Sequence, residues 1–312
     1  MNQFLEEVLN DLSNSPKRLN SKYFYDEKGD KLFQEIMNCP EYYPTDCEME
    51  IFTAHTKELA LALKNGFNTF DLVELGAGDA TKSSHLLREL VDMQVEFTYM
   101  PIDISSSMIT YLEESLPLKI AGLDVQGLNG EYFEMLQKSN QLSSRKKVVL
   151  MLGGNLGNET PENAMAFCRK MRSVLQEGDI LLVGFDLKKN PATVLAAYND
   201  AAGFTRDFNL NLLHRINNEL EGNFDIKQFE HYPTYDPATG ACKSFLISKI
   251  AQKVIISGQT FIFEENEFIF MEISQKYSIA EIEELAVACG FRTVRHFFDH
   301  KKWFVDTVWQ CV

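Results

Sequence analysis

Five short apolar runs alternate with amphipathic segments of helical length in the first two thirds of the chain. The runs are residues 70–75, 97–103, 122–128, 148–153 and 179–186. Between the last two runs, apolar residues recur on one helical face, at Ala164, Phe167, Cys168, Met171 and Leu175. Strands that alternate with helices form a parallel sheet with helices on both faces. The pattern therefore predicts an α/β fold, Rossmann-like in its layers, whose ligands bind at the carboxyl ends of the strands.

The pattern changes after residue 186. Residues 190–220 have helical periodicity, and residues 226–277 have the alternation of antiparallel strands. The spacing of Ser278 and Glu281 is that of a capping box, which predicts one more helix before two final strands, around 292–298 and 302–311. We therefore expect an α/β domain formed by 61–186 and 278–312. A smaller α+β domain would combine 1–60 with an insertion at 187–277.

Charge and composition exclude several classes of protein. The formal net charge of −15 disfavours binding to nucleic acid and to anionic membranes. No apolar run approaches the roughly 20 residues of a membrane-spanning helix, and the amino terminus lacks the pattern of a secretory signal. The six cysteines and six histidines show no metal-ligand spacing. We expect a soluble cytoplasmic protein with reduced thiols, no metal and no implied protein partner.

The first apolar run leads into a glycine-containing turn, Glu74-Leu-Gly76-Ala-Gly78-Asp79. Glycines allow a sharp turn and a close approach of the backbone to a ligand. The helix that follows, from about Thr81, directs its amino end to the same place and favours a negative group there. The carboxylate of S-adenosylmethionine suits this position, and Lys82 is a further candidate contact. A plain strand–helix turn is the alternative.

Two later strand ends add candidate contacts for the same cofactor. Asp103 ends the second strand, where a carboxylate can accept hydrogen bonds from both ribose hydroxyls. Glu131 and Tyr132 follow the third strand and could contact adenine by hydrogen bonding and stacking; a solvated helix start is equally compatible with them. The pattern ExGxG, rather than GxGxxG, favours a nucleoside with one carboxylate over one with a pyrophosphate. Together these residues indicate a methyltransferase.

Motifs along nearly the whole chain resemble those of the histidine-specific Nα-methyltransferase family of ergothioneine biosynthesis. Besides the glycine-containing turn, they are residues 22–33, 41–45, 101–105, 153–158, 196–203, 208–209, 229–231 and 271–276. The resemblance implies a class I methyltransferase domain and a second domain that contributes to binding the amino acid, which lies between the two. It also implies S-adenosylmethionine as cofactor and an amino acid as substrate.

The resemblance assigns roles to seven residues. Tyr42, Asn158 and Tyr198 match positions that hold the α-amino and carboxylate groups of the substrate. Tyr25 and Phe33 match an aromatic wall beside the amine, and Glu272 and Ser274 match the pair that binds the imidazole. Two departures stand out: 154–156 reads Gly-Asn-Leu where Ser-Thr-Ile is expected, and Glu131-Tyr132 stands where Asp-Phe is more usual.

The chemistry of these residues agrees in part with the implied roles. Glu272 and Ser274 are two apart on a predicted strand, so their side chains share a face and could bind the two nitrogens of an imidazole. A solvent-facing strand is the alternative. The amide of Asn158 can donate to a carboxylate and accept from an amine, although an asparagine in a turn can also satisfy local backbone. Most of the aromatic residues at 23–43 are expected in the core. Tyr25 and Tyr42 are the two that we expect to face a trimethylammonium group.

The expected reaction is transfer of methyl groups from S-adenosylmethionine to the α-amine of histidine, giving trimethylhistidine (hercynine). Alignment of the reacting atoms is the main catalytic requirement. No residue stands out as a base, and Tyr25, Asn158 or a water could orient the amine. The alternatives are another amino acid, such as a tryptophan derivative, and a cofactor-binding sensor without activity.

Overall fold

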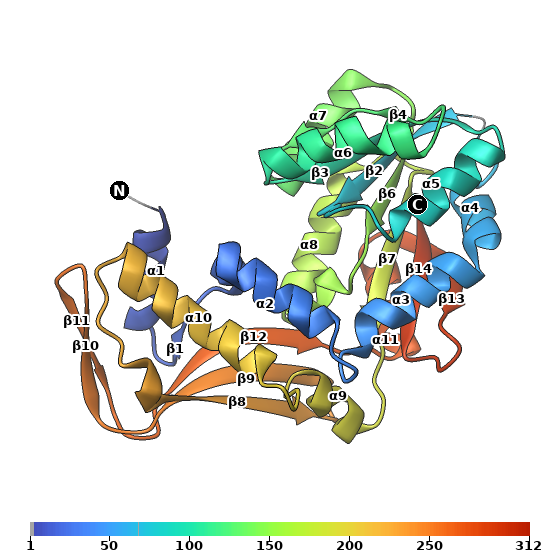
Figure 1. Ribbon diagram of the computed structural model, residues 1–312. Helices are drawn as coiled ribbons and strands as arrows, with labels where there is room; N and C mark the ends of the chain where they lie inside the picture. The colour runs from blue at the N-terminus through green and yellow to red at the C-terminus, as the bar shows by residue number, and fades with distance from the viewer. Residues whose placement is uncertain (1–2, 68) are drawn as a thin grey trace. The chain divides into compact units, whose positions relative to one another are not determined.

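The computed structural model describes residues 3–67 and 69–312. By compactness the chain divides into two units, each built from separate segments. Unit 1 comprises residues 1–43 and 189–275, and unit 2 comprises residues 44–188 and 276–312. Most helices and strands of both are labelled in Figure 1. The described residues include no helix of the length and apolar character needed to cross a membrane.

Unit 2 contains a mixed sheet of eight strands among its described residues. Its order is β13-β14-β7-β6-β2-β3-β4, with β5 also paired to β3. The strands are β2 (Thr69–Leu75), β3 (Glu96–Asp103), β4 (Asp124–Val125), β5 (Leu128–Asn129), β6 (Lys146–Met151), β7 (Ile180–Asp186), β13 (Phe291–Phe298) and β14 (Phe304–Cys311). All pairs are parallel except those of β14, which is antiparallel to both neighbours. The predicted α/β fold is confirmed.

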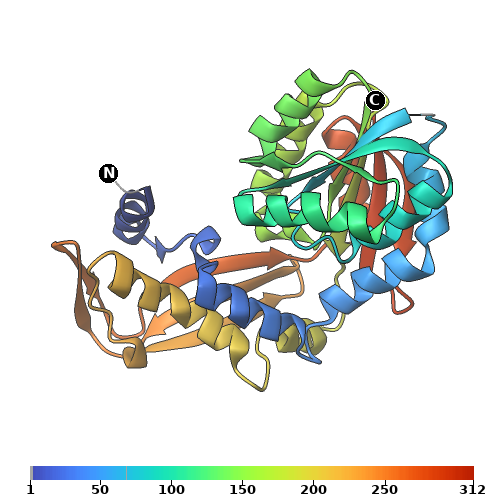
Figure 2. The same ribbon diagram turned by 45° about the horizontal axis from the view of Figure 1, so that its top comes forward.

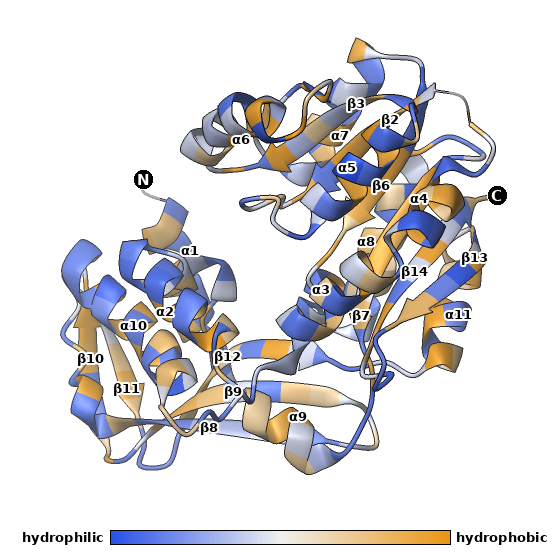
Figure 3. Cartoon of the chain, turned by 45° about the vertical axis from the view of Figure 1, so that its right-hand side comes forward, coloured by the Kyte–Doolittle hydropathy of each residue, from blue (hydrophilic) through white to orange (hydrophobic). Residues whose placement is uncertain are grey.

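The central strands of this sheet are buried on both faces, as in other parallel sheets covered by helices. Their apolar character is visible along β2 and β6 in Figure 3. The helices of the unit are α3 (Tyr43–Ala54), α4 (Thr56–Lys64), α5 (Ser83–Asp92), α6 (Ser106–Lys119), α7 (Tyr132–Leu142), α8 (Pro161–Val174) and α11 (Ile279–Ala288). Helices α7, α8 and α11 pack their apolar residues on one face of the sheet, around Val73, Val149 and Phe185. The predicted capping box of Ser278 and Glu281 opens α11.

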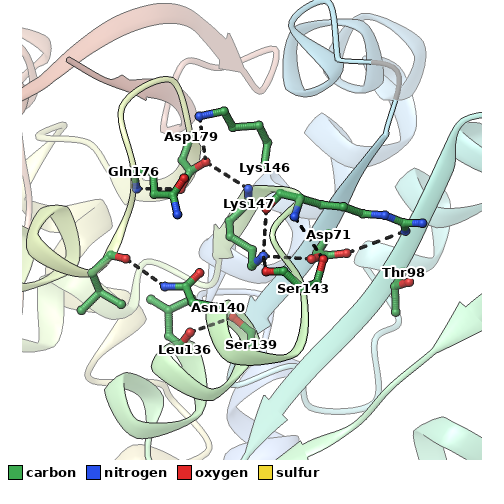
Figure 4. Close-up of polar contacts among 12 residues, drawn as sticks. Asp71, Thr98, Leu136, Ser139, Asn140, Ser143, Lys146, Lys147, Gln176 and Asp179 are labelled. Carbon is green, nitrogen blue, oxygen red and sulfur yellow. Dashed lines mark hydrogen bonds and ion pairs between the residues drawn. The ribbon is translucent and has the colours of Figure 1, made fainter.

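A buried ion pair lies toward the amino ends of β2 and β6 (Figure 4). Lys147 donates to Asp71 at 2.9 Å, and both side chains are almost fully buried. The same ammonium donates to the backbone carbonyls of Ser143 and Arg145, and Asp179 nearby accepts from the backbone N–H of Lys147. Buried charges require such complete partnering. The amino ends of β2 and β6 are therefore held by this ion pair as well as by apolar packing.

Unit 1 contains an antiparallel sheet to which one short parallel strand is added. The order is β1-β12-β9-β8, where β1 (Lys17–Arg18) pairs in parallel with β12 (Phe268–Gln275). The others are β9 (Ala241–Ser248) and β8 (Phe229–Asp236), and β10 (Gln252–Ile256) forms a separate hairpin with β11 (Gln259–Phe263). The antiparallel strands predicted for 226–277 are thus present.

The helices of unit 1 come from both of its segments. They are α1 (Gln3–Ser13), α2 (Glu27–Met37), α9 (Pro191–Ala197) and α10 (Phe204–Glu219), with short 3-10 turns at Ser21–Phe24 and Ile226–Gln228. Helices α2 and α10 lie side by side, as both views show (Figures 1 and 2). One apolar core joins Phe4, Phe24 and Ile36 of the first segment to residues of α10 and the sheet. Residues far apart in sequence therefore complete a single core.

The first boundary between the units differs from the expected one at 60/61. It falls between Tyr43 and Pro44, so almost all of α3 and the whole of α4 belong to unit 2. Their apolar residues explain the difference: Phe52 and Leu59 are fully buried, and α4 packs on α5 and β13. Helical periodicity alone gave no indication of which core these helices would join.

Candidate functional site

The turn after β2 has the backbone that its glycines permit. Gly76 and Gly78 have φ angles of 65° and 53°, in the left-handed region that favours glycine. A Cβ built on Gly76 would lie only 2.7 Å from the hydroxyl of Tyr132, whereas one on Gly78 would meet nothing within 4 Å. Helix α5 begins at Ser83, two residues later than predicted. The turn thus leaves exposed backbone at Gly76 beside the Tyr132 side chain.

Glu74 lies beneath this turn rather than on its surface. The side chain is buried and accepts a hydrogen bond of 2.5 Å from the hydroxyl of Tyr99. Burial raises the pKa of Glu74 to about 7, and the hydrogen bonds from Tyr99 and Ser83 oppose that rise. Through this hydrogen bond Glu74 links the end of β2 to β3 beneath the turn.

Three other predicted cofactor residues gather next to the turn. Asp103 ends β3 half-buried, and its carboxylate accepts from the backbone N–H of Ser105 at 2.8 Å. Glu131 precedes α7 and is exposed, and Tyr132 begins that helix. Burial raises the pKa of the Tyr132 hydroxyl, and the charges of Asp103 and Glu131 raise it further. The acidic groups and the ring are thus close to one another and to Gly76.

Lys82 is held by a residue that the sequence did not identify. Its ammonium forms an ion pair with the fully buried carboxylate of Glu48 on α3. The other oxygen of Glu48 accepts from the backbone N–H of Gly153 at 2.7 Å. Gly153 follows β6 and precedes the 3-10 turn Asn155–Asn158, whose last residue, Asn158, is exposed. One carboxylate thereby connects Lys82 to the segment that leads to Asn158.

The residues predicted to bind the imidazole lie together in unit 1. Glu272 and Ser274 are half-buried on one face of β12, while their neighbours Met271 and Ile273 are buried on the other face. The hydroxyl groups of Tyr198 and Ser274 are joined by a hydrogen bond of 2.7 Å. Tyr198 was predicted to hold the α-amino and carboxylate groups of the substrate. The structure places it beside Ser274, a member of the pair predicted to bind the imidazole.

Five aromatic rings of unit 1 form a connected group, which we call the aromatic group: Tyr25, Phe33, Tyr42, Tyr198 and Phe208. Ring centroids are 5.6 Å apart for Tyr25 and Phe33, 6.4 Å for Phe33 and Tyr42, and 6.2 Å for Tyr42 and Tyr198. These contacts are mostly edge to face. Tyr25 is about half exposed, at 48%. All four predicted aromatic residues therefore contact one another in one place.

Two members of this neighbourhood were not predicted as site residues. Phe208, on α10, contacts the rings of Tyr25 and Phe33. Asn209 is fully buried, and its amide donates to Glu272 at 3.4 Å and to the Thr205 carbonyl at 3.0 Å. The sequence did contain one indication of these two residues, because 208–209 is among the motifs that resemble the family. Asn209 is a polar residue in a helix whose other buried residues are mostly apolar.

A third cluster has the composition of a metal site. Ligand atoms of Glu50, Asp299 and His300 lie within 4.8 Å of one another. The Asp299 carboxylate, however, already accepts from three backbone N–H groups of its own loop, and His300 is hydrogen-bonded to Glu50. These hydrogen bonds hold the backbone of the loop at 299–304 in place, and none of the predicted site residues belongs to the cluster.

Apart from Asn158, the predicted residues thus form two groups, one inside each unit. Gly76, Lys82, Asp103, Glu131 and Tyr132 surround the β2–α5 turn in unit 2 with Glu74 beneath it. Tyr25, Phe33, Tyr42, Tyr198, Glu272 and Ser274 belong to unit 1, while Asn158 belongs to unit 2. The first group offers an acidic strand end and an open glycine backbone. The second offers aromatic faces, a carboxylate and hydroxyl groups.

Comparison with known proteins gives consistent matches over nearly the whole chain. Residues 4–311 match the model of a family described as histidine-specific, S-adenosylmethionine-dependent methyltransferases. Histidine N-alpha-methyltransferases from Mycobacterium tuberculosis and Mycolicibacterium smegmatis are each 31% identical, covering 94% and 92% of this chain and 90% and 88% of theirs. Ergothioneine biosynthesis protein 1 of Neurospora crassa is 30% identical over 89% of this chain and 32% of its own length.

Proposed function

The chain belongs to the family of histidine-specific, S-adenosylmethionine-dependent methyltransferases, and we propose that it methylates the α-amino nitrogen of L-histidine up to trimethylhistidine. The observation that carries the choice of substrate is the placement of Glu272, Ser274 and Tyr198. A carboxylate and a hydroxyl on one face of β12 suit the two ring nitrogens of an imidazole. An indole has one ring N–H and would leave the second group without a partner.

The residues around the β2–α5 turn fit S-adenosylmethionine. The backbone at Gly76 is exposed and has no side chain, Asp103 ends the neighbouring strand as expected for ribose recognition, and Tyr132 provides a ring. Lys82 supplies a cation for the carboxylate of the cofactor. When bound, S-adenosylmethionine supplies a methyl group on a sulfonium, which is a strongly activated leaving group.

The proposed task of the remaining residues is orientation. Tyr42, Tyr198 and Asn158 would hold the α-amino and carboxylate groups of histidine, while Glu272 and Ser274 hold the ring. Fixing the substrate at both ends restricts the amine to one direction of approach, and such orientation lowers the barrier of a direct transfer. Tyr25 and Asn158 would orient the lone pair of the neutral amine.

The aromatic group suits a substrate that gains charge during the reaction. Each methylation makes the nitrogen larger and less hydrated, and the trimethylated amine carries a permanent charge. Such cations are stabilised by ring faces within about 6 Å. Tyr25, with its exposed ring, and Tyr42 are the residues that we assign to this contact.

The test is mass spectrometry of the purified protein with S-adenosylmethionine and each of the twenty amino acids. We expect histidine alone to gain three methyl groups. Methylation of a different amino acid would retain the reaction but overturn the roles of Glu272 and Ser274. Absence of transfer to any of them would contradict the proposed function.

We further propose that the product feeds ergothioneine synthesis in the cytoplasm. The name of the Neurospora relative supports the first point. Six free cysteines, all buried, support a reducing compartment. Loss of ergothioneine when the gene is deleted, and its recovery when trimethylhistidine is supplied, would support the assignment, whereas unchanged ergothioneine would contradict it.

A further inference from the structure

Unit 2 contains a group of buried charges next to the cofactor turn, and its charges do not balance. The carboxyl groups of Glu48, Glu74 and Asp306 all interact electrostatically with one cation, Lys82. Glu48 and Asp306 are fully buried and Glu74 nearly so. Three carboxylates and one ammonium would leave two uncompensated negative charges in the interior, which is strongly unfavourable.

Asp306 is the least satisfied member of the group. Both of its carboxyl oxygens are buried, and neither has a hydrogen-bond partner in the described part of the chain if the group is ionised. The side chain that faces it is Glu48, whose two oxygens already accept from the Lys82 ammonium and from the backbone N–H of Gly153. A buried carboxylate without donors would lose all of its hydration without replacement. A protonated Asp306, in contrast, can donate its O–H to Glu48.

The sequence around Gly184 fits this pairing. Gly184 lies in the interior of β7 and pairs across the sheet with Asp306. A Cβ at this position would lie 2.5 Å from a carboxyl oxygen of Glu48 and 3.1 Å from one of Asp306. The glycine therefore makes room for both carboxyl groups on the same side of the strand, so they are close neighbours in the folded unit.

We propose that Glu48 is a positioning residue that holds the Lys82 ammonium and the Gly153 backbone in place. Its carboxylate would accept a hydrogen bond from the O–H of a protonated Asp306. The two oxygens of Glu48 thereby fix the Lys82 ammonium beside the cofactor turn and the start of the segment that leads to Asn158. Burial raises the pKa of Asp306 well above its usual range, and the charge of Glu48 raises it further while Lys82 lowers it. Burial and the charge of Glu48 thus favour the protonated form of Asp306.

The inference rests on the proposed function only in taking S-adenosylmethionine as the ligand near Lys82. Its first test needs no ligand. Infrared difference spectroscopy between wild type and Asp306→Asn, at neutral pH, should show loss of the carbonyl stretch of a protonated carboxyl. Because the pKa of Glu74 is about 7, its protonation can change between the two proteins, so the same difference is also measured in a Glu74→Gln background. Loss of a carboxylate band with no loss of a protonated-carboxyl carbonyl band would overturn the proposal, because Asp306 would then be ionised.

The second test is calorimetric titration with S-adenosylmethionine in the absence of any amino acid. Asn can donate to Glu48 as the protonated acid does, so Asp306→Asn should keep the Kd within about twofold of wild type. Asp306→Ala, which removes the donor, and Glu48→Gln, which removes the charge, should each raise the Kd by about tenfold or more. An unchanged Kd in Glu48→Gln, or equal losses in the Asn and Ala variants, would contradict the positioning role.

Asp179→Asn is the matched control. Asp179 is a buried acid of the same sheet whose carboxylate accepts from the backbone N–H groups of Lys147 and Gln176, just before the amino end of β7 (Figure 4). This variant should lower the melting temperature but keep the Kd within about twofold. If histidine is not the substrate, the infrared and calorimetric results are unaffected, so the two proposals fail separately.

Discussion

The carboxylate of Glu272 has the clearest individual role in the proposed chemistry. It lies on the face of β12 that also carries Ser274, and it accepts a long hydrogen bond from the buried amide of Asn209. Glu272→Gln should raise the KM for histidine by about 10- to 100-fold, because a hydrogen bond to a charged group is lost. The Kd of S-adenosylmethionine should change by less than about twofold. Steady-state kinetics and calorimetry together measure both quantities.

A suitable control for Glu272 is Glu230, an exposed residue of the same sheet on β8. Glu230→Gln changes the same charge and should leave both constants unaltered. Equal weakening of histidine and cofactor binding in Glu272→Gln would show that the residue supports the fold rather than the ring.

The β2–α5 turn depends on two glycines that are needed for different reasons. Gly76→Ala combines an unfavourable φ with a contact of 2.7 Å to the Tyr132 hydroxyl, whereas Gly78→Ala has only the unfavourable φ. We expect Gly76→Ala to raise the Kd of S-adenosylmethionine by more than tenfold, and Gly78→Ala by less. Calorimetry would measure both values.

Removing the hydroxyl tests whether this contact is the cause. Adding Tyr132→Phe to Gly76→Ala should recover part of the affinity, while the same change in Gly78→Ala should not. A recovery of equal size in both backgrounds would mean that the hydroxyl and the Gly76 backbone do not interact.

Strand β8 carries a histidine that makes unit 1 sensitive to acid. His231 is buried, and burial lowers its pKa to about 4, with Arg206 lowering it further and Asp200 opposing. The unfolded chain binds this proton near pH 6.5, but the folded unit does not. The stability that depends on neutral His231 is therefore fully present above about pH 6.5 and is lost progressively down to about pH 4, on the order of 3 kcal/mol.

Thermal unfolding as a function of pH would measure this loss. His231→Gln should flatten the dependence between about pH 6.5 and pH 4, since no proton is taken up there. His85→Gln, at an exposed histidine, is the control and should follow the wild type. A steep dependence that persists in His231→Gln would assign it to other groups.

The sequence predicted elements better than it predicted which element joins which core. Apolar runs located β2, β3, β6 and β7, and the capping box located α11, because these signals are local. The third run, 122–128, became two strands of two residues each, β4 and β5. The membership of α3 in unit 2 depends on packing between distant segments, which periodicity does not report.

The candidate site was predictable to the same extent. Residues at strand ends or two apart on a strand could be named, because strand geometry fixes their direction. Glu48 was missed, since a glutamate on an amphipathic helix normally faces water and nothing local indicates a buried partner. Asp306 was missed because nothing local in its predicted strand distinguishes a buried aspartate from an exposed one. Asn209 lies in a motif that was recognised, but its contact with Glu272 depends on how α10 packs against the sheet.

A buried ion pair, Lys147 with Asp71, contributes to the stability of the unit 2 sheet toward the amino ends of β2 and β6. Asp71→Asn would leave Lys147 without its counter-charge and should destabilise the protein by about 3–5 kcal/mol. Chemical denaturation would measure this loss, and kcat per folded molecule should be unchanged because the pair lies away from the strand ends that carry the site. Asp71→Asn combined with Lys147→Met should recover much of the stability. A double variant no more stable than the single one would show that packing, rather than charge, is responsible.

The pairing of β1 with β12 has a consequence for how the protein is made. Lys17 bonds to Glu267, 250 positions later, so the first segment of unit 1 emerges from the ribosome long before its partners exist. At about 5–20 residues per second, that interval is roughly 12 to 50 seconds. Until α10 and β12 have been synthesised, the apolar residues of α1 and α2 have no complete core to enter, and they are available to chaperones or to neighbouring nascent chains. The amino-terminal helices can therefore pack only after the later segment of unit 1 has been synthesised.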